Sequence, residues 1–331
     1  MFYQAKTFTP RSWVKPSEAR VTMRQTHTWG NWGFTIANRW DSNHSMAFSG
    51  GGNQEARGGG INKAGSGSGP EGGGNLFYVD GVFEELDAPG EFYFNQSTST
   101  LYYYPRPEDD LSTTPIFIPQ IESVVAFRGY PDHAVEYVNV ANLTIAHSTV
   151  NFYESEQGYE APPGGDWAVH RGAMVFFDTV RSVSLVGCTV QSPGGNGIMV
   201  SNFARDVHIM RNHLSDAAES GVLLLGSTNL FDAYKNPNQP QDTVIANNHV
   251  HHVGRIGKQA APFFHGVSRN NSVLYNVFHS GPRAGINWND GMHGGSLVEG
   301  NLVFNMVAAT WDHGPFNSWT RQPWLTPNPG G

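Results

Sequence analysis

Apolar and polar residues alternate in short runs along the second half of the chain. The runs read VNVANLTI, VSLVGCTV, VHIMRNHL, TVIANNHV, SVLYNVF and SLVEGNLVF, between residues 138 and 304. Alternation with a period of two is typical of β-strands. Helical patterning is nearly absent, so the sequence predicts an all-β protein.

Each run carries a marker residue at a turn. The markers are Asn142, Cys188, Asn212, Asn248, Asn276 and Asn301. The shortest gaps between successive markers are 24 and 25 residues, and we interpret the longer gaps as loop insertions. After three of the markers a second apolar run begins nine residues later: GIMVSNF, GVLLLGS and GINWNDG. Each repeat is therefore predicted to be strand, turn, strand, turn.

A short all-β repeat cannot bury its apolar face alone, so successive repeats are expected to stack and pair their strands in register. A buried Asn at the same turn of every repeat can hydrogen-bond its equivalents and the backbone. The pattern predicts a parallel β-helix over residues 131–331. The alternative is a β-sandwich with meandering strands.

The first 130 residues are less regular. The stretch FYVDGVFEELDAPGEFYFNQSTSTLYYYP predicts a strand–turn–strand arrangement with aromatic strands. We expect residues 1–130 to form an irregular β-rich region with a small β-hairpin subdomain, inserted in the β-helix or packed on it. The Gly-rich stretches near residues 50–74 do not lie between a strand and a helix, so a phosphate-binding loop is not expected.

Composition excludes several classes of partner. The net charge is −8, so the chain has no basic footprint for nucleic acid. No apolar run approaches the roughly 20 residues of a membrane helix, so no membrane partner is predicted. Cys188 is the single cysteine, which rules out an internal disulfide. Nothing in the sequence indicates an oligomeric state.

Several stretches in combination resemble a known family. They are TWGNWGF, GGGNQEARGGG, FYVDGVFEELDAPGEFYFNQSTSTLYYYP, GGDWAVHRGA, GGNGIMVSN, GPRAGINWNDG and DHGPFNSW, between about residues 25 and 323. Together they resemble large, mostly secreted right-handed β-helix proteins related to glycoside hydrolases, with xylosidase-, fucosidase- and xylanase-like relatives. The resemblance implies a right-handed, single-stranded parallel β-helix and a carbohydrate substrate. It also implies secretion, with an N-terminal part and export signal that precede this chain.

The chain departs from that family at three positions. An acidic residue often precedes DHGP in the family, where this chain has Ala308 and Ala309. Another often follows FNSW, where this chain has Thr320. These departures put the arrangement of the active site in doubt.

Glycoside hydrolysis needs two carboxyl groups, about 5–5.5 Å apart for retention and about 6.5–9.5 Å apart for inversion. Applying the nine-residue step to Asn301 places Asp312 beside Asn287 and His313 beside Trp288. Equivalent residues of neighbouring repeats lie about 4.8 Å apart. The sequence therefore predicts Asp312 and Asp290 as the catalytic pair, with His313 tuning Asp312 or binding a sugar hydroxyl. The alternative is that both aspartates cap turns.

Further polar and aromatic residues are predicted to bind substrate on the same repeats or on adjoining loops. They are Asp166, His170, Arg171, Lys258, His265, Arg283, Asn287, Asn289 and Trp319. Asp166 is also an alternative carboxyl partner. Arg171 and Arg283 are suited to grip an acidic sugar, and the alternative for Arg171 is a loop-fixing salt bridge. His249 and His251 share one face of a strand, but no third ligand is evident, so no metal site is predicted.

The sequence therefore predicts a secreted glycoside hydrolase that acts, without a cofactor, on a complex plant or algal polysaccharide or oligosaccharide. One alternative is a polysaccharide lyase that uses Lys258, Arg283 and His313. Such enzymes often use Ca²⁺, but a cluster of Asp ligands is not evident here. The other alternative is a non-catalytic carbohydrate-binding β-helix protein, favoured by Ala308, Ala309 and Thr320.

Overall fold

The computed structural model describes residues 11–24, 31–53, 77–130, 132–150, 152, 159–161, 167–229, 238–291, 294–310 and 313–319. In these ranges the fold is all-β, and its helical segments are three 3-10 turns, η1 (Pro16–Glu18), η2 (Asp41–Asn43) and η3 (Phe83–Glu85). Among the described residues, no helix has the length and apolar character needed to cross a membrane.

The chain divides into two compact units. Unit 1 comprises Met1–Thr26, Trp32–Gly52 and Gly59–Ile118. Unit 2 comprises Pro119–Gly331 and two short segments, His27–Asn31 and Asn53–Gly58.

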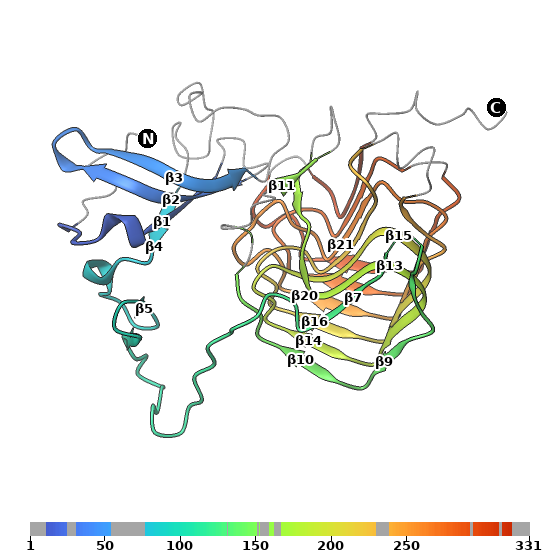
Figure 1. The fold of residues 1–331 in the computed structure, drawn as a ribbon, viewed down its shortest axis with the longest axis horizontal. Coiled ribbons are helices and arrows are strands. Elements are labelled where there is room, and N and C mark those ends of the chain that lie inside the picture. Colours follow the sequence, from blue (N-terminus) through green and yellow to red (C-terminus); the bar gives the residue numbers. More distant parts are fainter. Residues whose placement is uncertain are drawn as a thin grey trace. The chain divides into compact units, whose positions relative to one another are not determined.

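Unit 1 contains a four-stranded sheet in the order β3 (Ser45–Asn53), β2 (Asn31–Trp40), β1 (Arg20–Arg24) and β4 (Phe77–Asp80) (Figure 1). Its small core is built from apolar side chains of these strands and of the flanking turns, including Val21, Met23 and Ile36. Strands β5 (Phe92–Asn95) and β6 (Thr100–Tyr103) form an antiparallel hairpin. The predicted aromatic strand–turn–strand is therefore confirmed.

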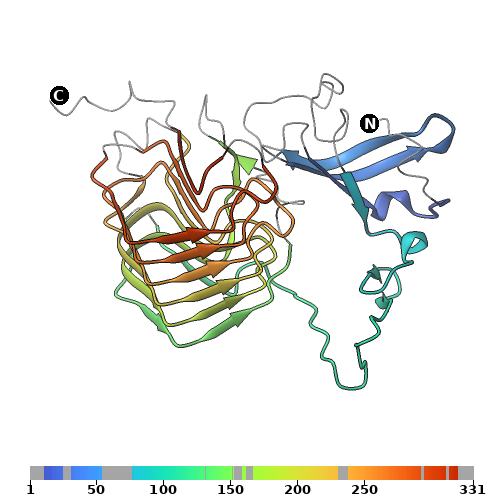
Figure 2. The same ribbon diagram turned by 180° about the vertical axis from the view of Figure 1, so that it is seen from behind.

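Unit 2 is a stack of parallel strands, in which successive turns of the chain lie one above the next (Figures 1 and 2). We distinguish three rows. Row 1 contains β7 (Val125–Arg128), β13 (Ala173–Val186), β15 (Asn196–Met210), β17 (Val222–Leu225), β21 (Phe263–Gly266), β24 (Ile286–Asn289) and β27 (Phe316–Trp319). Row 2 contains β9 (Asn139–Ala141), the later halves of β13 and β15, β19 (Val244–Ala246), β22 (Ser272–Leu274) and β25 (Leu297–Glu299). Row 3 contains β10 (Thr144–Ala146), β14 (Thr189–Gln191), β16 (His213–Ser215), β20 (His249–His251), β23 (Val277–His279) and β26 (Leu302–Phe304).

Short strands complete unit 2. Strands β8 (Val135–Glu136) and β18 (Pro240–Gln241) pair with the middle of β13 and β15, respectively. Strand β11 (Tyr159–Glu160) pairs antiparallel with β12 (Val169–His170). The three rows surround one apolar core, to which each contributes every second side chain, for example Phe263 from row 1, Val273 from row 2 and Phe278 from row 3. This is the alternation that the sequence pattern predicts.

A ladder of asparagines runs along row 3, one residue before each of the strands β16, β20, β23 and β26. Asn248 shows the pattern: its Nδ2 donates to the carbonyl of Ile209 at 2.8 Å and to Oδ1 of Asn276 at 2.9 Å. Its own Oδ1 accepts the backbone N–H of Asn212 at 3.0 Å. The ladder continues from Asn276 to Asn301, whose Oδ1 accepts the backbone N–H of Asn276 at 2.9 Å. The predicted hydrogen bonding between equivalent asparagines is therefore confirmed.

The first two markers differ from the others. Cys188 occupies the level below Asn212, and its backbone N–H donates to the Asn212 side chain at 2.9 Å. Asn142 was expected at the same position one repeat earlier, but pairing of Thr144 with Thr189 places Asn142 opposite Gly187. This expectation was wrong by one residue, because Asn142 takes the left-handed turn conformation (φ 56°) that Gly187 (φ 63°) takes in the next repeat.

Candidate functional site

The face of row 1 that points away from the main core changes character along the stack. Strand pairing aligns one column of side chains: Phe176, Met199, Leu223, Phe264, Asn287 and Asn317. The first four pack with Trp167 and Val169 in a second apolar cluster. From β24 onward the column is polar, and Asn317 Nδ2 donates to Asn287 Oδ1 at 2.8 Å. The polar part of this face therefore lies on β24 and β27.

The predicted register of the last repeat was wrong. Asn287 pairs with Asn317 and Trp288 with Ser318, in place of Asp312 and His313. Ile286 follows Asn276 by 10 residues, whereas its partner Phe316 follows Asn301 by 15 (286 − 276 against 316 − 301). The turn before β27 is thus five residues longer, and periodicity does not encode turn length. Asp312 and Asp166 lie outside the described residues.

Asp290 follows β24 and is almost completely buried, at 1% exposure. Trp167 donates its Nε1–H to Asp290 Oδ2 at 2.5 Å. The backbone of Asp290 is left-handed, with φ 42°, a conformation that Asp tolerates better than most residues. The hydrogen bond fixes the orientation of the carboxylate relative to Trp167. The left-handed backbone is also compatible with the alternative in which Asp290 caps a turn.

His265 of β21 pairs with Trp288 of β24, the strand that Asp290 follows. His265 is fully buried, and its ring stacks on Trp288 with centroids 3.9 Å apart. Burial lowers the pKa of His265 to about 4, because the imidazolium form loses its hydration. Its Nδ1 lies 3.2 Å from the carbonyl oxygen of Asn289. Asn289 itself is only 2% exposed, so these predicted substrate-binding groups are covered by protein.

Arg283 and His313 form a pair at the other end of β24. Arg283 is buried, and its Nη2 lies 2.7 Å and its Nε 3.1 Å from His313 Nε2. Arg283 precedes β24 and Asp290 follows it, and four strand residues span roughly 13 Å. The structure therefore brings Arg283 and His313 together but separates them from Asp290 by the length of the strand.

Arg171 has the contacts of a structural residue. Its Nε and Nη2 donate to the two carboxylate oxygens of Glu160 at 2.9 Å each, a bidentate pair. Nη1 and Nη2 also donate to Ser201 Oγ at 2.8 Å and to the carbonyl of Gly226 at 2.9 Å. The salt-bridge alternative for Arg171 is therefore present, and the contacts of Arg171 join β11 to β15 and to the end of β17.

Two further predicted substrate-binding residues also contact protein groups. Lys258 Nζ donates to the carbonyls of Gly254 at 2.6 Å and Arg255 at 3.0 Å. His170 is 5% exposed, and its carbonyl accepts the side-chain amide of Asn196. By contrast, Trp319, at the end of β27 opposite Asn289, is 51% exposed and can offer a ring face to a sugar.

Glu219 is a buried acid that the sequence reasoning did not single out. It is 1% exposed and accepts the hydroxyl of Tyr159 at 2.8 Å. Burial raises the pKa of Glu219 to about 7, against the opposing effect of the Tyr159 hydrogen bond. A carboxyl group with such a pKa can donate a proton near neutrality. The signal in the sequence is an acid within the small and apolar residues just before the VLLL strand.

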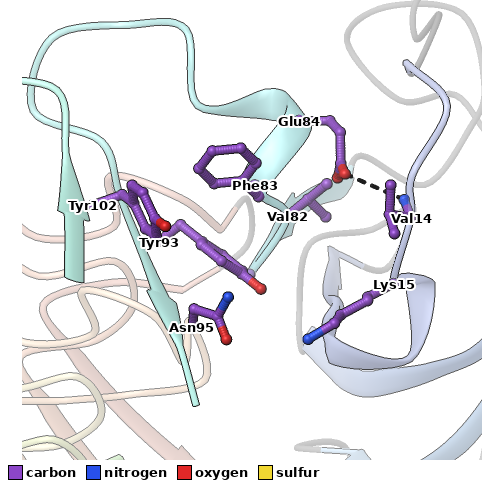
Figure 3. A pocket seen from close by; sticks show the side chains of 9 residues that line it. Val14, Lys15, Val82, Phe83, Glu84, Tyr93, Asn95 and Tyr102 are labelled. Carbon is purple, nitrogen blue, oxygen red and sulfur yellow. Dashed lines mark hydrogen bonds between the residues drawn. The ribbon is translucent and has the colours of Figure 1, made fainter. Parts of the chain in front are cut away.

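Unit 1 contains a pocket of about 320 Å³ beside the hairpin (Figure 3). The rings of Phe83, Tyr93 and Tyr102 line one side, and Glu84 lies opposite them with its Oε1 accepting the backbone N–H of Val14 at 3.3 Å. The hydroxyl of Tyr93 donates to Glu18, which raises the pKa of Tyr93 to about 12. The aromatic lining suits a sugar ring or another flat ligand.

Comparison with known proteins gives a likeness of fold. A solved structure described as a glycoside hydrolase superposes on this chain with a TM-score of 0.70 and 16% sequence identity. The match covers 92% of this chain and 57% of that protein, so the chain spans little more than half of its structural neighbour. No protein-family model and no curated protein matches the sequence. The chain therefore has a fold like that of a glycoside hydrolase.

Proposed function

We propose that the chain is a glycoside hydrolase acting on a complex plant or algal glycan, built on a right-handed, single-stranded parallel β-helix. The fold likeness over 92% of the chain carries this proposal. The three parallel rows and the ladder of equivalent asparagines support the β-helix architecture. Secretion and the absence of a cofactor belong to the same proposal.

The polar side chains of the last two row-1 strands support a substrate site there. The column that is apolar from Phe176 to Phe264 becomes Asn287 and Asn317. Asn287 is only 2% exposed, so the half-buried Asn317 and the exposed ring of Trp319 are the accessible groups of this strand end. Carbohydrate recognition uses amides for hydroxyl groups and aromatic faces for the apolar faces of sugars. A groove on these C-terminal strands is thus the proposed substrate site.

The proposed chemistry keeps Asp290 and Asp312 as the two carboxylates, although the observed register pairs Asn287 with Asn317 and so removes the spacing argument for this pair. The Trp167 hydrogen bond supports a fixed orientation of Asp290. A positioned carboxylate is what either mechanism of glycosidic hydrolysis requires. His313, which accepts hydrogen bonds from Arg283, is proposed to bind a sugar hydroxyl.

The test is release of reducing ends from a panel of neutral and acidic glycans. Asp312→Asn and Asp290→Asn are each expected to lower kcat/KM at least roughly 100-fold, the usual scale for loss of a general acid or base. Asp206→Asn, a change of an exposed acid on β15, is the control and should retain activity. Thermal unfolding of Asp290→Asn must be measured in parallel, because the side chain is buried.

Three outcomes would contradict the proposal. Full activity of Asp312→Asn would exclude the two-carboxylate mechanism. Products with the ultraviolet absorbance of an unsaturated uronide would identify a lyase. Glycan binding without any product would identify a binding protein.

A further inference from the structure

Histidines gather on the outer face of row 3, away from the proposed substrate site. His213 lies on β16, His249 and His251 on β20, and His279 on β23. Parallel pairing sets His213 beside His249 and His251 beside His279. His213 and His249 are exposed, and His251 and His279 are half-buried. The four rings thus form one surface cluster across three neighbouring strands.

The ring nitrogens of these histidines converge. Nε2 of His213 lies 2.8 Å from Nε2 of His251, and Nε2 of His249 lies 2.8 Å from Nε2 of His279. One ligand nitrogen from each of His213, His249 and His251 lies within 4.8 Å of the other two. Zinc–nitrogen bonds are about 2.0–2.1 Å long, so two nitrogens of a tetrahedral site are roughly 3.3 Å apart. Small rotations of the rings would therefore bring the nitrogens to that spacing.

Three histidines of the cluster favour the neutral imidazole, the form that binds metal ions. Burial, together with the neighbouring His249, His213, His279 and His252, lowers the pKa of His251 to about 4. Burial and neighbouring histidines also lower the pKa of His249 and of His279. The rings of His249, His251 and His279 therefore keep a lone pair for a metal ion at neutral pH.

The second ring nitrogens of His251 and His279 contact groups that orient these two rings. Nδ1 of His251 lies 2.6 Å from Nδ1 of His252, and Nδ1 of His279 lies 2.8 Å from Ser280 Oγ. Phe304 stacks on His279 with centroids 4.7 Å apart. Such contacts to the second nitrogen fix the tautomer and the orientation of a ligand histidine.

We propose that His213, His249, His251 and His279 bind one divalent transition-metal ion of the zinc type. The arrangement supplies four imidazole ligands from three successive strands, and four ligands complete a closed tetrahedral site. An ion held there would tie together three levels of the stack. Its role is therefore stabilising, and it is independent of the proposed glycan chemistry.

The test is titration of the metal-free full chain with zinc sulfate, followed by calorimetry. We expect one ion per chain with a dissociation constant of roughly 1 µM or below. The same addition should raise Tm by several degrees, because the ion binds the folded state. Co²⁺ in place of zinc should give the visible absorption of a tetrahedral site.

The variants are His249→Gln together with His251→Gln, and His213→Gln alone. The double variant should weaken zinc binding at least roughly 100-fold, and the single one about 10-fold. His208→Gln is the matched control, because this histidine on β15 pairs with Asp206 and lies outside the cluster. It should bind zinc like the wild type.

Absence of stoichiometric binding by the wild type would overturn the proposal and leave a hydrogen-bonded imidazole cluster. Equal affinity of the His213→Gln variant and the wild type would also overturn it. Since His213 is exposed, that variant is expected to fold even if the double variant does not.

Discussion

Two stacks of identical polar residues run side by side along row 3, and they differ in environment. Asn212 and Asn248 immediately precede His213 and His249 in the chain. The asparagines are 2–3% exposed and belong to the interior, whereas the histidines lie on the outside. Successive side chains of a strand point to opposite faces, so a single parallel register creates both stacks.

The comparison shows why the two stacks serve different purposes. A side-chain amide has both donors and an acceptor, so each asparagine can satisfy the next one and the backbone. A neutral imidazole has a single N–H and a single lone pair, and a cluster of such rings near solvent can bind a cation. Stacking identical side chains thus gives stability in the interior and a candidate metal site at the surface.

The largest effect is expected on breaking the asparagine ladder. Asn248→Leu removes the partners of the Asn212 backbone N–H and of the Ile209 carbonyl, both buried. Each unsatisfied group costs about 1–3 kcal/mol, so the free energy of unfolding should fall by about 4 kcal/mol. Urea denaturation measures the change. Asn301→Ala, at the half-buried end of the ladder, should cost less than half as much, and an equal cost would contradict this account.

A second prediction concerns a buried acid outside both stacks. The pKa of Glu219 is raised to about 7 from 4.5, so the folded state holds a proton that the unfolded state releases between those values. Its stabilising effect is complete below about pH 4.5 and is lost as the pH rises through 7. The stability of the wild type should thus fall by roughly 3 kcal/mol from pH 4.5 to 8 through this group.

Glu219→Gln keeps the shape of the side chain and removes the titration. Its stability should show a correspondingly smaller decline over that range, as measured by urea denaturation at several pH values. Glu136→Gln, a change of a surface acid paired with Arg181, is the control and should follow the wild type. A Glu219→Gln variant with an unchanged pH dependence would refute the assignment.

The smallest effect is expected in the histidine cluster without metal. His249→Gln should change the free energy of unfolding by less than about 0.5 kcal/mol in the presence of a chelator, because its side chain is exposed. Asn248→Leu, one residue earlier, is expected to cost far more of the free energy of unfolding, because Asn248 is buried. Comparable losses in the two variants would show that both stacks are structural.

Sequence patterns predict the strands of unit 2 and the Asn212–Asn301 ladder because both depend on local alternation and on recurring spacing. The same patterns fail at β27, where five additional residues in the turn move Asn317 to the side of Asn287. The same patterns place His249 and His251 on one face of a strand but do not reveal the other two histidines of the cluster. His213 and His279 join that pair only when the strands stack, since no local rule connects residues this far apart in the chain.

The sequence by itself determines which side chains of a strand face the core and which face away, because that choice follows from the period of two. Tertiary structure decides which groups cover the side chains that face away from the core. Trp167 lies over Asp290 from 123 residues away, and Glu160 neutralises Arg171 from a separate strand. Residues predicted as an accessible site are therefore partly buried, since loop contacts between distant segments depend on packing rather than on periodicity.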